Sequence, residues 1–357
     1  MPTFAVIGVG LIGGSVGLAA RERLGATVRG FDPAEGVLQT ACERGAVDVP
    51  CSSMSDAVAE ADTVVVAAPV GALPEAVAQS LQAASRDTVV TDVGSTKRAI
   101  VAAADDERFV GGHPLAGAET AGVEHARADL FEGATWYLTP TATTSGLLYE
   151  RLHRAIAALG ARPAAIDATD HDRVLAAVSH LPHVLANVLV TQAGEALPAG
   201  GEGLTATGPS FRDATRVAGA NSRIWGDIYL SNADALAERI DASIARLAEV
   251  RDLLRAGDRE GVTAWNEAAA AERRGLLEAG VAGGPVQELR VSVPNRPGVV
   301  AQVALALGRA GVNIVDMALH PTPDMTEGLI ALWVSGDREA DRAVELIAEL
   351  DLPVARA

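Results

Sequence analysis

The sequence is poor in cysteine and in aromatic residues. It holds two cysteines, Cys42 and Cys51, among 357 residues, and only 3% of its residues are Phe, Trp or Tyr. Two cysteines without metal-like pairing predict no metal site and suit a protein of the reducing cytoplasm. Because 49% of the residues are hydrophobic but few are aromatic, the core must consist mostly of Ala, Val and Leu.

Excess positive charge and long apolar runs are also missing. The formal net charge is −17, which argues against nucleic acid or an anionic membrane surface as the main partner. Asp, Glu, Arg or Gly interrupts every apolar run before it reaches membrane-spanning length. The first expected strand begins at residue 3, so no basic-then-apolar leader precedes it. We therefore expect a cytoplasmic protein of two or three domains with no membrane partner.

A glycine-rich turn follows directly behind the first short apolar run, which we expect to be a strand at 3–8. The turn has the pattern Gly-x-Gly-x-x-Gly and precedes a segment, 15–24, that can open a helix. The first glycine allows the turn, the second lets a pyrophosphate approach the backbone, and the third lets helix and strand pack closely. The free N–H groups at the start of the helix then face the phosphates. The residues expected to hold the dinucleotide are Gly8, Gly10, Leu11, Ile12 and Gly13.

A carboxylate at the end of the second expected strand identifies the dinucleotide. The strand at 26–31 ends in Asp32, about 20 residues beyond the turn, as the fingerprint requires. A carboxylate there accepts hydrogen bonds from the ribose hydroxyls and repels a 2′-phosphate, which favours NAD over NADP. Arg29 lies on the same strand, where alternation should point it elsewhere. The alternative is another α/β sheet, such as a flavodoxin-like one, with an incidental glycine turn.

The first 167 residues alternate apolar strands with Ala- and Val-rich helices. Strands buried on both faces read as continuous apolar runs, so we predict a Rossmann-type, doubly wound parallel sheet at 1–167. The expected strands are 3–8, 26–31, 62–68, 88–93, 108–112, 135–138 and 164–166.

The apolar pattern changes to helical spacing at 168–282. The segment 174–189 is apolar over most of its circumference, which is typical of a helix in a core or at a subunit interface. A second long helix is expected at 231–256, with charged residues on one face. We predict an all-α domain that packs against its copy in a homodimer.

A linker of small residues at 282–285 precedes a compact third unit at 286–357. The expected order in this unit is strand, helix, strand, strand, helix and a short last strand. This order predicts a ferredoxin-like βαββαβ domain.

The loops behind the later strands carry candidate cofactor and catalytic groups, because ligands of open α/β sheets bind beyond the carboxyl ends of the strands. Ala68 and Pro69 end one strand and could wall the nicotinamide side. Asp92 and Ser95 lie in the loop after the next strand. Ser95 could hydrogen-bond a substrate hydroxyl and the nicotinamide amide, or it could cap the helix that follows.

His113 is the first choice of catalytic group. It lies at the end of a strand, behind two glycines, beside the expected place of a nicotinamide. An imidazole can take the proton of a substrate hydroxyl near neutral pH, which hydride removal from that carbon requires. The alternative is a histidine that only hydrogen-bonds its own loop.

Two histidines and a proline interrupt the apolar helical segment at 179–183. His180 and His183 have no neighbouring Cys or carboxylate, and the proline distorts the turn, so we expect no metal there. Polar groups in an apolar helix are better explained by an active-site cleft, with His183 the stronger candidate and His180 the one that could serve structure. His171 and Asp172, at the start of this segment, are expected to be a capping and support pair.

Two arginines lie four residues apart in the segment 208–216 and share a helix face. Either Arg212 or Arg216 could clamp a carboxylate with two parallel hydrogen bonds. The alternative for each is a solvated surface charge.

Taken together, these segments resemble the prephenate/arogenate dehydrogenase family of tyrosine biosynthesis. The matching motifs are GVGLIGGS, TDVGSTK, GGHPLAGAETAG, SHLPH, FRDATR and IWGDI, in order from residue 3 to about 280. The terminal unit resembles the ACT regulatory domain, with NRPG at 295–298 and GVNI at 311–314 as its marks. The resemblance implies oxidative decarboxylation of prephenate to 4-hydroxyphenylpyruvate, with a hydride passing from the ring carbon to NAD⁺.

The resemblance also implies roles for single residues. By this resemblance His113 accepts the proton of the ring hydroxyl, and Ser95 bridges that hydroxyl and the nicotinamide. His183 binds the substrate, Arg216 holds a substrate carboxylate, and Trp225 lies near the cleft. One departure, Asn-Ser-Arg at 221–223 where relatives often have Ser-Asp-Pro, leaves the shape of that loop open.

Three other functions stay open. Arogenate has an amine where prephenate has a side-chain keto group, and Glu119 could favour that ammonium. A β-hydroxyacid dehydrogenase would usually place a catalytic Lys in the helical domain, but no Lys occurs between residues 167 and 281. A non-catalytic sensor of NAD and amino acids is the third, and the joint presence of His113, Ser95 and Arg216 argues against it.

The resemblance of the terminal unit to ACT domains implies an amino acid bound between paired copies. We expect tyrosine or another aromatic amino acid near Asn295, Gly298 and Asn313. The alternative is a unit that only stabilises a dimer.

Overall fold

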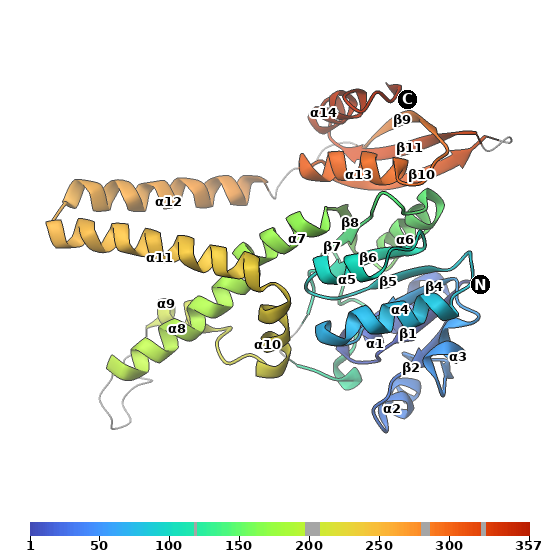
Figure 1. Ribbon diagram of the computed structural model, residues 1–357, viewed down its shortest axis with the longest axis horizontal. Coiled ribbons are helices and arrows are strands. Elements are labelled where there is room, and N and C mark those ends of the chain that lie inside the picture. The colour runs from blue at the N-terminus through green and yellow to red at the C-terminus, as the bar shows by residue number, and fades with distance from the viewer. Residues whose placement is uncertain (118–119, 197–207, 280–285, 323–325) are drawn as a thin grey trace. The chain divides into compact units, whose positions relative to one another are not determined.

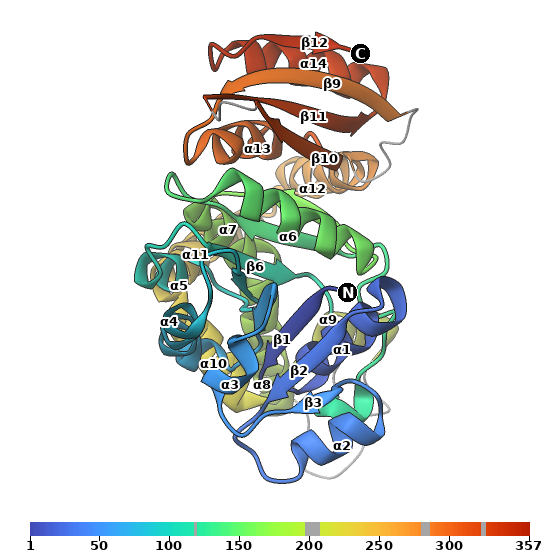
Figure 2. The ribbon, with the colours of Figure 1, turned by 90° about the vertical axis from the view of Figure 1, so that its right-hand side faces the viewer.

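The computed structural model describes residues 1–117, 120–196, 208–279, 286–322 and 326–357. The chain forms two compact units. One unit comprises Met1–His171 together with Gly283–Ala357, and the other comprises Asp172–Ala282. The first unit therefore contains both the N-terminal and the C-terminal part of the chain (Figures 1 and 2).

The N-terminal part is an eight-stranded sheet with helices on both faces (Figure 2). Its strands are β1 (Thr3–Ile7), β2 (Thr27–Phe31), β3 (Val49–Pro50), β4 (Thr63–Val66), β5 (Val89–Asp92), β6 (Phe109–Pro114), β7 (Thr135–Thr139) and β8 (Arg162–Ala165). The strand order is β3-β2-β1-β4-β5-β6-β7-β8. The helices are α1 (Leu11–Leu24), α2 (Val37–Glu43), α3 (Met54–Val58), α4 (Leu73–Ala83), α5 (Arg98–Ala103) and α6 (Gly146–Ala158), with 3₁₀ turns η1 (Val70–Ala72) and η2 (Val123–His125).

Each face of this sheet has its own hydrophobic cluster, because side chains alternate along a strand. Phe4 and Val6 of β1 pack in the cluster that includes α1 and α6. Ala5 and Ile7 of the same strand pack in the cluster that includes α3 and α4. A sheet covered on both faces explains why its strands read as unbroken apolar runs, and it confirms the predicted Rossmann-type fold.

One pair of strands departs from the parallel arrangement. Strand β7 runs antiparallel to β6, whereas β8 is again parallel to β7. A parallel crossover normally uses a helix, but the described residues between β6 and β7 hold only the 3₁₀ turn η2. The order of predicted elements did not reveal this reversal.

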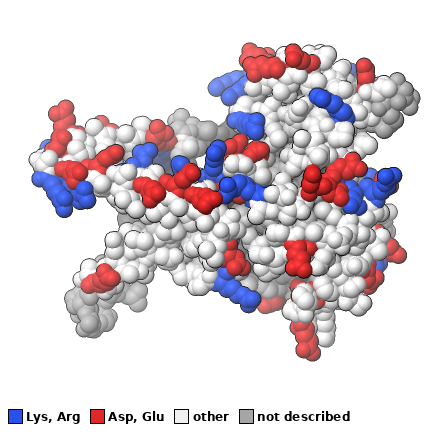
Figure 3. All heavy atoms as spheres, viewed as in Figure 1, with Lys and Arg blue, Asp and Glu red and all other residues white. Residues whose placement is uncertain are grey.

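The second unit is helical, as predicted, and its described residues contain no strand. A continuous helix consists of α7 (Ala168–Leu175), the π-helical turn η3 (Ala176–His180) and α8 (Leu181–Ala196), and its residues up to His171 belong to the first unit. It is followed by α9 (Pro209–Thr215), α10 (Ser222–Ser231), α11 (Ala233–Ala256) and α12 (Arg259–Ala279). Acidic and basic side chains are interspersed along α11 and α12 (Figure 3).

The continuous helix at Ala168–Ala196 is long and apolar enough to cross a membrane by length and composition. The expectation that no apolar segment reaches that length was therefore wrong, because the isolated polar residues within it do not break the helix. Only 22% of its most apolar stretch of 18 residues is buried. Val178, Val188 and Leu189 are among its exposed apolar side chains. A subunit interface is one setting for such a helix.

The C-terminal part is a four-stranded antiparallel sheet with two helices. Its elements are β9 (Val286–Pro294), α13 (Val299–Arg309), β10 (Ile314–Pro321), β11 (Glu327–Ser335), α14 (Asp337–Ala348) and β12 (Val354–Arg356). The strand order β10-β11-β9-β12 is that of the predicted ferredoxin-like domain.

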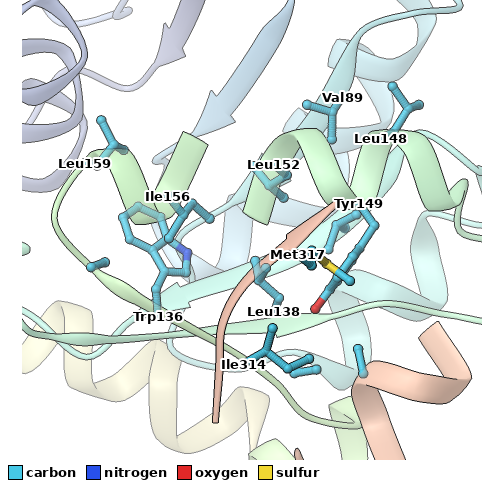
Figure 4. Close-up of a cluster of buried hydrophobic side chains, with 14 of the residues drawn as sticks. Val89, Trp136, Leu138, Leu148, Tyr149, Leu152, Ile156, Leu159, Ile314 and Met317 are labelled. Carbon is cyan, nitrogen blue, oxygen red and sulfur yellow. The ribbon is translucent and has the colours of Figure 1, made fainter. Parts of the chain in front are cut away.

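The C-terminal domain shares a continuous hydrophobic cluster with the N-terminal sheet. Tyr149 and Leu152 of α6 meet Ile314 and Met317 of β10 in this cluster (Figure 4). Arg154 of α6 also donates to the Met317 carbonyl, at 3.2 Å. The two domains of this unit are thus joined by a packed core.

His153 is buried beside this junction. Its side chain is 1% exposed, and neither ring nitrogen has a hydrogen-bond partner among the described residues. Burial lowers the pKa of His153 from 6.5 to about 4, an effect that Asp316 opposes and Arg154 reinforces. The folded protein therefore keeps this ring neutral, whereas the unfolded chain takes up a proton below about pH 6.5.

This difference predicts a loss of stability in mild acid. Since the folded pKa is depressed, the contribution of His153 is complete above pH 6.5 and is lost as the pH falls toward about 4. Between pH 7 and pH 4.5 we expect a loss of about 2–3 kcal/mol in unfolding free energy from this residue. Urea denaturation at both pH values should show a shallower loss for His153→Leu than for the wild type. Equal losses of unfolding free energy in the two proteins would show that His153 is not the source of the acid sensitivity.

Candidate functional site

The glycine turn between β1 and α1 has the geometry that a dinucleotide cradle needs. Gly8 has φ +88°, and a Cβ there would lie 2.6 Å from the Ala67 carbonyl oxygen. A Cβ on Gly13 would lie 2.0 Å from the Gly8 carbonyl oxygen. Gly10, in contrast, has nothing within 4 Å of the place of a Cβ. The first and third glycines therefore permit the turn and the packing, and the second leaves open space for a ligand.

The start of α1 is not capped by a side chain. Gly10 is the N-cap residue and offers no side-chain acceptor, so the first N–H groups of the helix, at Leu11 and Ile12, are not taken up by a cap. This is the arrangement that binds phosphate at helix N-termini. The residues present fit the pyrophosphate of a dinucleotide.

Asp32 stands next to this turn. Its carboxylate accepts hydrogen bonds from the backbone N–H of Val9 at 2.8 Å and of Ala34 at 2.9 Å. These bonds hold it at the end of β2, and a carboxylate retains lone pairs for ribose hydroxyls. Arg29 is turned away, as predicted, because its guanidinium bonds to Asp56 and Glu60. The site therefore keeps the negative charge that disfavours a 2′-phosphate.

Ala68 and Pro69 follow β4, the strand that pairs with β1. The nitrogen of Ala68 would be 3.2 Å from a Cβ on Gly8, so this segment borders the glycine turn. Pro69 is exposed and precedes η1. Ala68 thus lies at the edge of the cradle, and the wall on the nicotinamide side stays a prediction.

Asp92 and Lys97 form a buried ion pair under the loop after β5. Both side chains are 0% exposed, and the Lys97 ammonium donates to Asp92 Oδ2. The same carboxylate accepts from the N–H of Gly94 at 2.8 Å and of Gly112 at 3.0 Å. The Asp92 side chain thus braces the loop from below, so a contact with the cofactor could come only from its backbone.

Sequence reasoning missed Lys97. It is the only lysine among the 29 basic residues of the chain. A single lysine two residues after a candidate catalytic serine was the signal that could have revealed it.

Ser95 lies half-buried in the braced loop. The residue that caps α5 is Lys97, with no side-chain cap bond, so Ser95 does not cap that helix. Capping of α5, the alternative to a role in binding substrate and cofactor, is therefore ruled out for Ser95. The binding role itself stays a prediction.

His113 lies on β6 and is 8% exposed. Its Nδ1 is 2.9 Å from Nε2 of His171, which is fully buried. The His171 ring also meets the edges of His113 and Tyr137, with ring centroids 5.1 and 5.7 Å apart. These contacts hold the plane of the His113 ring.

The His113–His171 contact bears on the chemistry of His113, and which ring donates in it depends on the tautomers of the two rings. An imidazole accepts a proton at Nε2 only when its own proton is on Nδ1. A bond in which Nδ1–H of His113 donates to Nε2 of His171 selects that tautomer. His171 and Asp172 were expected to be a capping and support pair, and the contact of His171 with His113 is that of a supporting residue. The cap of α7 is Asp167, whose carboxylate accepts from the N–H of Thr169 at 2.8 Å.

His183 and Trp225 form the centre of the candidate site in the helical unit. Their rings are stacked, with centroids 3.5 Å apart and an interplanar angle of 24°. Burial, followed by the positive charge of Arg216, lowers the pKa of His183 below its ordinary value of 6.5. A neutral imidazole, an aromatic face and an arginine can together receive a ring and a carboxylate.

His180 has a different environment. It is 1% exposed, its Nδ1 is 3.2 Å from Asn232 Nδ2, and that amide also donates to the Asp172 carbonyl at 2.7 Å. It lies in the π-helical turn, a feature often found near functional sites. Its burial favours the structural role over direct substrate binding. Among the described residues, no group of three or more His, Cys, Asp or Glu could hold a metal ion.

The remaining predicted substrate residues lie on or near α9 and α10. Arg216 follows α9 directly and is exposed, as is Arg212 one turn earlier. Asn221 caps α10, accepting from the N–H of Arg223 and of Ile224 at 3.2 and 3.3 Å. The departure at 221–223 thus still begins the helix that carries Trp225. Glu119 lies outside the described residues.

Within one chain, two of the three predicted effector residues lie close together. Asn295 and Gly298 lie at the start of α13, where Gly298 has φ +80°. Asn313 lies beyond its other end, and eleven helical residues separate the two by about 16 Å. A cavity of about 180 Å³ adjoins the first end, lined by Asn295, Arg296 and Pro297 together with Glu107, Ser145 and Leu147 of the N-terminal domain.

Comparisons with known proteins agree with this organisation. The family model of the prephenate dehydrogenase nucleotide-binding domain matches residues 16–164. The prephenate dehydrogenase dimerization domain matches 167–267, and the ACT domain matches 288–345.

Relatives match over most of the chain. The prephenate dehydrogenase of Bacillus subtilis (strain 168) is 32% identical, with 97% of this chain and 95% of that protein covered. The crystal structure of Aquifex aeolicus prephenate dehydrogenase with hydroxyphenyl propionate and NAD⁺ has a TM-score of 0.72 and 28% identity. That match covers 77% of this chain and 98% of the other. The structure of Synechocystis arogenate dehydrogenase has a TM-score of 0.68 and 25% identity, covering 77% of this chain and 99% of the other.

Proposed function

Because the chain belongs to the prephenate dehydrogenase family, we propose that its site performs the reaction of that family with the residues described above. The enzyme converts prephenate to 4-hydroxyphenylpyruvate and CO₂, and its cofactor is NAD. NAD⁺ bound in the glycine cradle supplies the hydride acceptor. The observation that carries the assignment of residues is the His113–His171 pair, buried in the same unit as that cradle.

The chain's own residues have three tasks in this reaction. His113 takes the proton of the ring hydroxyl at Nε2, while His171 keeps the other ring nitrogen engaged. Ser95, on the loop braced by Asp92 and Lys97, orients the hydroxyl. Loss of CO₂ from the ring then restores aromaticity, which makes the conversion effectively irreversible.

Substrate binding falls to the helical unit. Arg216 offers two parallel donors to a carboxylate, and neutral His183 offers a hydrogen bond without adding a second positive charge. Trp225 supports the His183 ring by stacking. Orientation and carboxylate binding are the contributions that the reaction demands of the protein.

Arogenate is the second candidate substrate, because the Synechocystis structure named for it matches 77% of this chain. NADH formation with prephenate and with arogenate, compared as kcat/KM, separates the two. We expect prephenate to give the larger value. A larger value for arogenate would reverse the preference, and no NADH with either would refute the function.

We propose that the ACT domain binds tyrosine, or another aromatic amino acid, in the cavity at the start of α13. The cavity offers Glu107 for an ammonium group and Arg296 with Asn295 for a carboxylate. Tyrosine should change activity or raise the thermal midpoint, since a ligand of the folded state stabilises it. Asn295→Ala should weaken that response, and Asn313→Ala should leave it nearly intact. No response of the wild type to tyrosine would count against the site.

A homodimer of the helical unit and a cytoplasmic location complete the proposal. The exposed apolar side chains of α8 support a partner surface there, and the matching family model is that of a dimerization domain. Cys42 and Cys51 are free thiols, in keeping with a reducing compartment. A monomer in light scattering would contradict the dimer.

A further inference from the structure

The helix that carries His171 begins directly after β8. Asp167 caps this helix through its carboxylate, which accepts from Thr169 N–H at 2.8 Å and from Asp170 N–H at 3.4 Å. His171 N–H donates to the Asp167 carbonyl at 2.8 Å. His171 is therefore fixed to the first turn of α7, and a displacement of that turn moves its ring.

The C-terminal domain touches this first turn. Gly308, near the end of α13, lies so close to β8 that a Cβ there would be 1.9 Å from the Ala165 carbonyl oxygen. The next residue, Arg309, reaches the first turn of α7, with Nε 3.5 Å from Asp170 Oδ2 and a guanidinium nitrogen 3.9 Å from Asp167 Oδ2. The close approach at Gly308 brings Arg309 within reach of both carboxylates.

The contact of Arg309 lies at the surface, whereas the bond between His171 and His113 is buried. The start of α7 carries two acidic side chains, Asp167 as its cap and Asp170 in its first turn. Arg309 is 59% exposed, so its pairs with them have only modest energy. The bond from His171 to His113 lies in a buried setting, where small displacements are not absorbed by solvent. A weak contact at the surface can therefore tune the geometry of a buried hydrogen bond.

We propose that Arg309, brought into place by Gly308, is a positioning residue for the base His113 and acts through the first turn of α7 and His171. The C-terminal domain then contributes to the catalytic geometry even without an effector. This inference rests on the proposed function, since it takes His113 to be the base. It assigns the domain a role that binding of an amino acid alone does not require.

Steady-state kinetics of the full-length enzyme test the proposal. Arg309→Ala should lower kcat about twofold to fivefold with an unchanged KM for NAD, on the scale of a surface ion pair. Arg309→Glu, which repels Asp167 and Asp170, should lower kcat further, and Arg309→Lys should restore much of it. Arg342→Ala, an exposed arginine on α14, is the matched control and should keep wild-type kcat.

A double-mutant cycle separates positioning from general destabilisation. In a His171→Ala background, Arg309→Glu should cause little further loss of kcat, because the path from α7 to the base is already broken. Unchanged kcat in Arg309→Glu would overturn the proposal, and so would an equal loss with and without His171. A wild type that forms no NADH from prephenate would instead refute the proposed function.

Gly308→Ala is a second probe of the same contact. The new Cβ must displace α13 from β8, so kcat should fall by about tenfold or more if the protein folds. The thermal midpoint of each variant shows whether it folds. If Gly308→Ala does not fold, the Arg309 series and the cycle decide alone.

Discussion

Replacing His113 with Asn lowers kcat by about 10²-fold or more, the usual scale for loss of a general base, while the affinity for NAD stays intact. Asn keeps a polar side chain of similar reach but cannot take up a proton at the position of Nε2. The substitution also removes the ring nitrogen that lies 2.9 Å from His171 in the wild type. Stopped-flow or steady-state NADH formation gives kcat, and fluorescence titration with NAD gives the affinity.

His125→Asn is the matched control for this change. His125 is an exposed histidine of the same domain, so its variant should keep wild-type kcat. Near-normal turnover of His113→Asn would show that another group accepts the proton. His171→Ala should fall between the two, because the base is kept but its tautomer and ring plane are no longer held.

Replacing Lys97 with Met lowers the free energy of unfolding by about 3–5 kcal/mol, the cost of leaving a buried charge without its partner. Both side chains of the Asp92–Lys97 pair are 0% exposed, so water cannot solvate the carboxylate that is left without its partner. Chemical denaturation measures the change. We also expect lower kcat, because Asp92 Oδ1 accepts from the N–H of Gly112, which directly precedes His113.

Two further variants show whether burial is the cause. Arg127→Met removes the partner of Asp129 in a pair whose side chains are about 60% exposed, and should cost at most about 1 kcal/mol. The double variant Asp92→Asn with Lys97→Met removes both charges and should recover part of the loss. A cost below about 1 kcal/mol for Lys97→Met alone would contradict the buried pair.

The unique lysine gives an independent measurement. An amine-reactive ester should label the native protein only at its N-terminal amine, since Lys97 is buried and no other lysine exists. Labelling of Lys97 should appear with unfolding. Rapid labelling of Lys97 in the native protein would show that the loop after β5 opens.

The parts of the fold that follow from local pattern were predictable. The strand, glycine turn, helix and Asp32 are close in sequence, and the steric demands of Gly8 and Gly13 arise within that one motif. The helical unit and the ferredoxin-like domain followed from the apolar spacing of consecutive segments. The reversed strand β7 did not, because the absence of a crossover helix leaves no periodic signal of its own.

The candidate site was predicted as a set of residues, and their contacts came only with the structure. His113 and Ser95 were chosen because they were expected to follow strands of a parallel sheet. His180 was placed among substrate residues because a polar side chain in an apolar helix looks functional, and only the structure shows it buried against Asn232. Asn313 was grouped with Asn295 by motif, and within one chain the length of α13 separates them, so the grouping stays a prediction.

The sequence by itself determined the kind of ligand, the order of the domains and the identity of the candidate base, because each depends on residues that are neighbours along the chain. Only the tertiary structure decided what holds that base. His171 is 58 positions from His113, and Met317 is 163 positions from the Arg154 that bonds to it. Such pairs leave no periodic trace in a single sequence, since they depend on how separate elements pack. The buried Asp92–Lys97 brace and the contact of Arg309 with α7 likewise arise only when that packing brings the elements together.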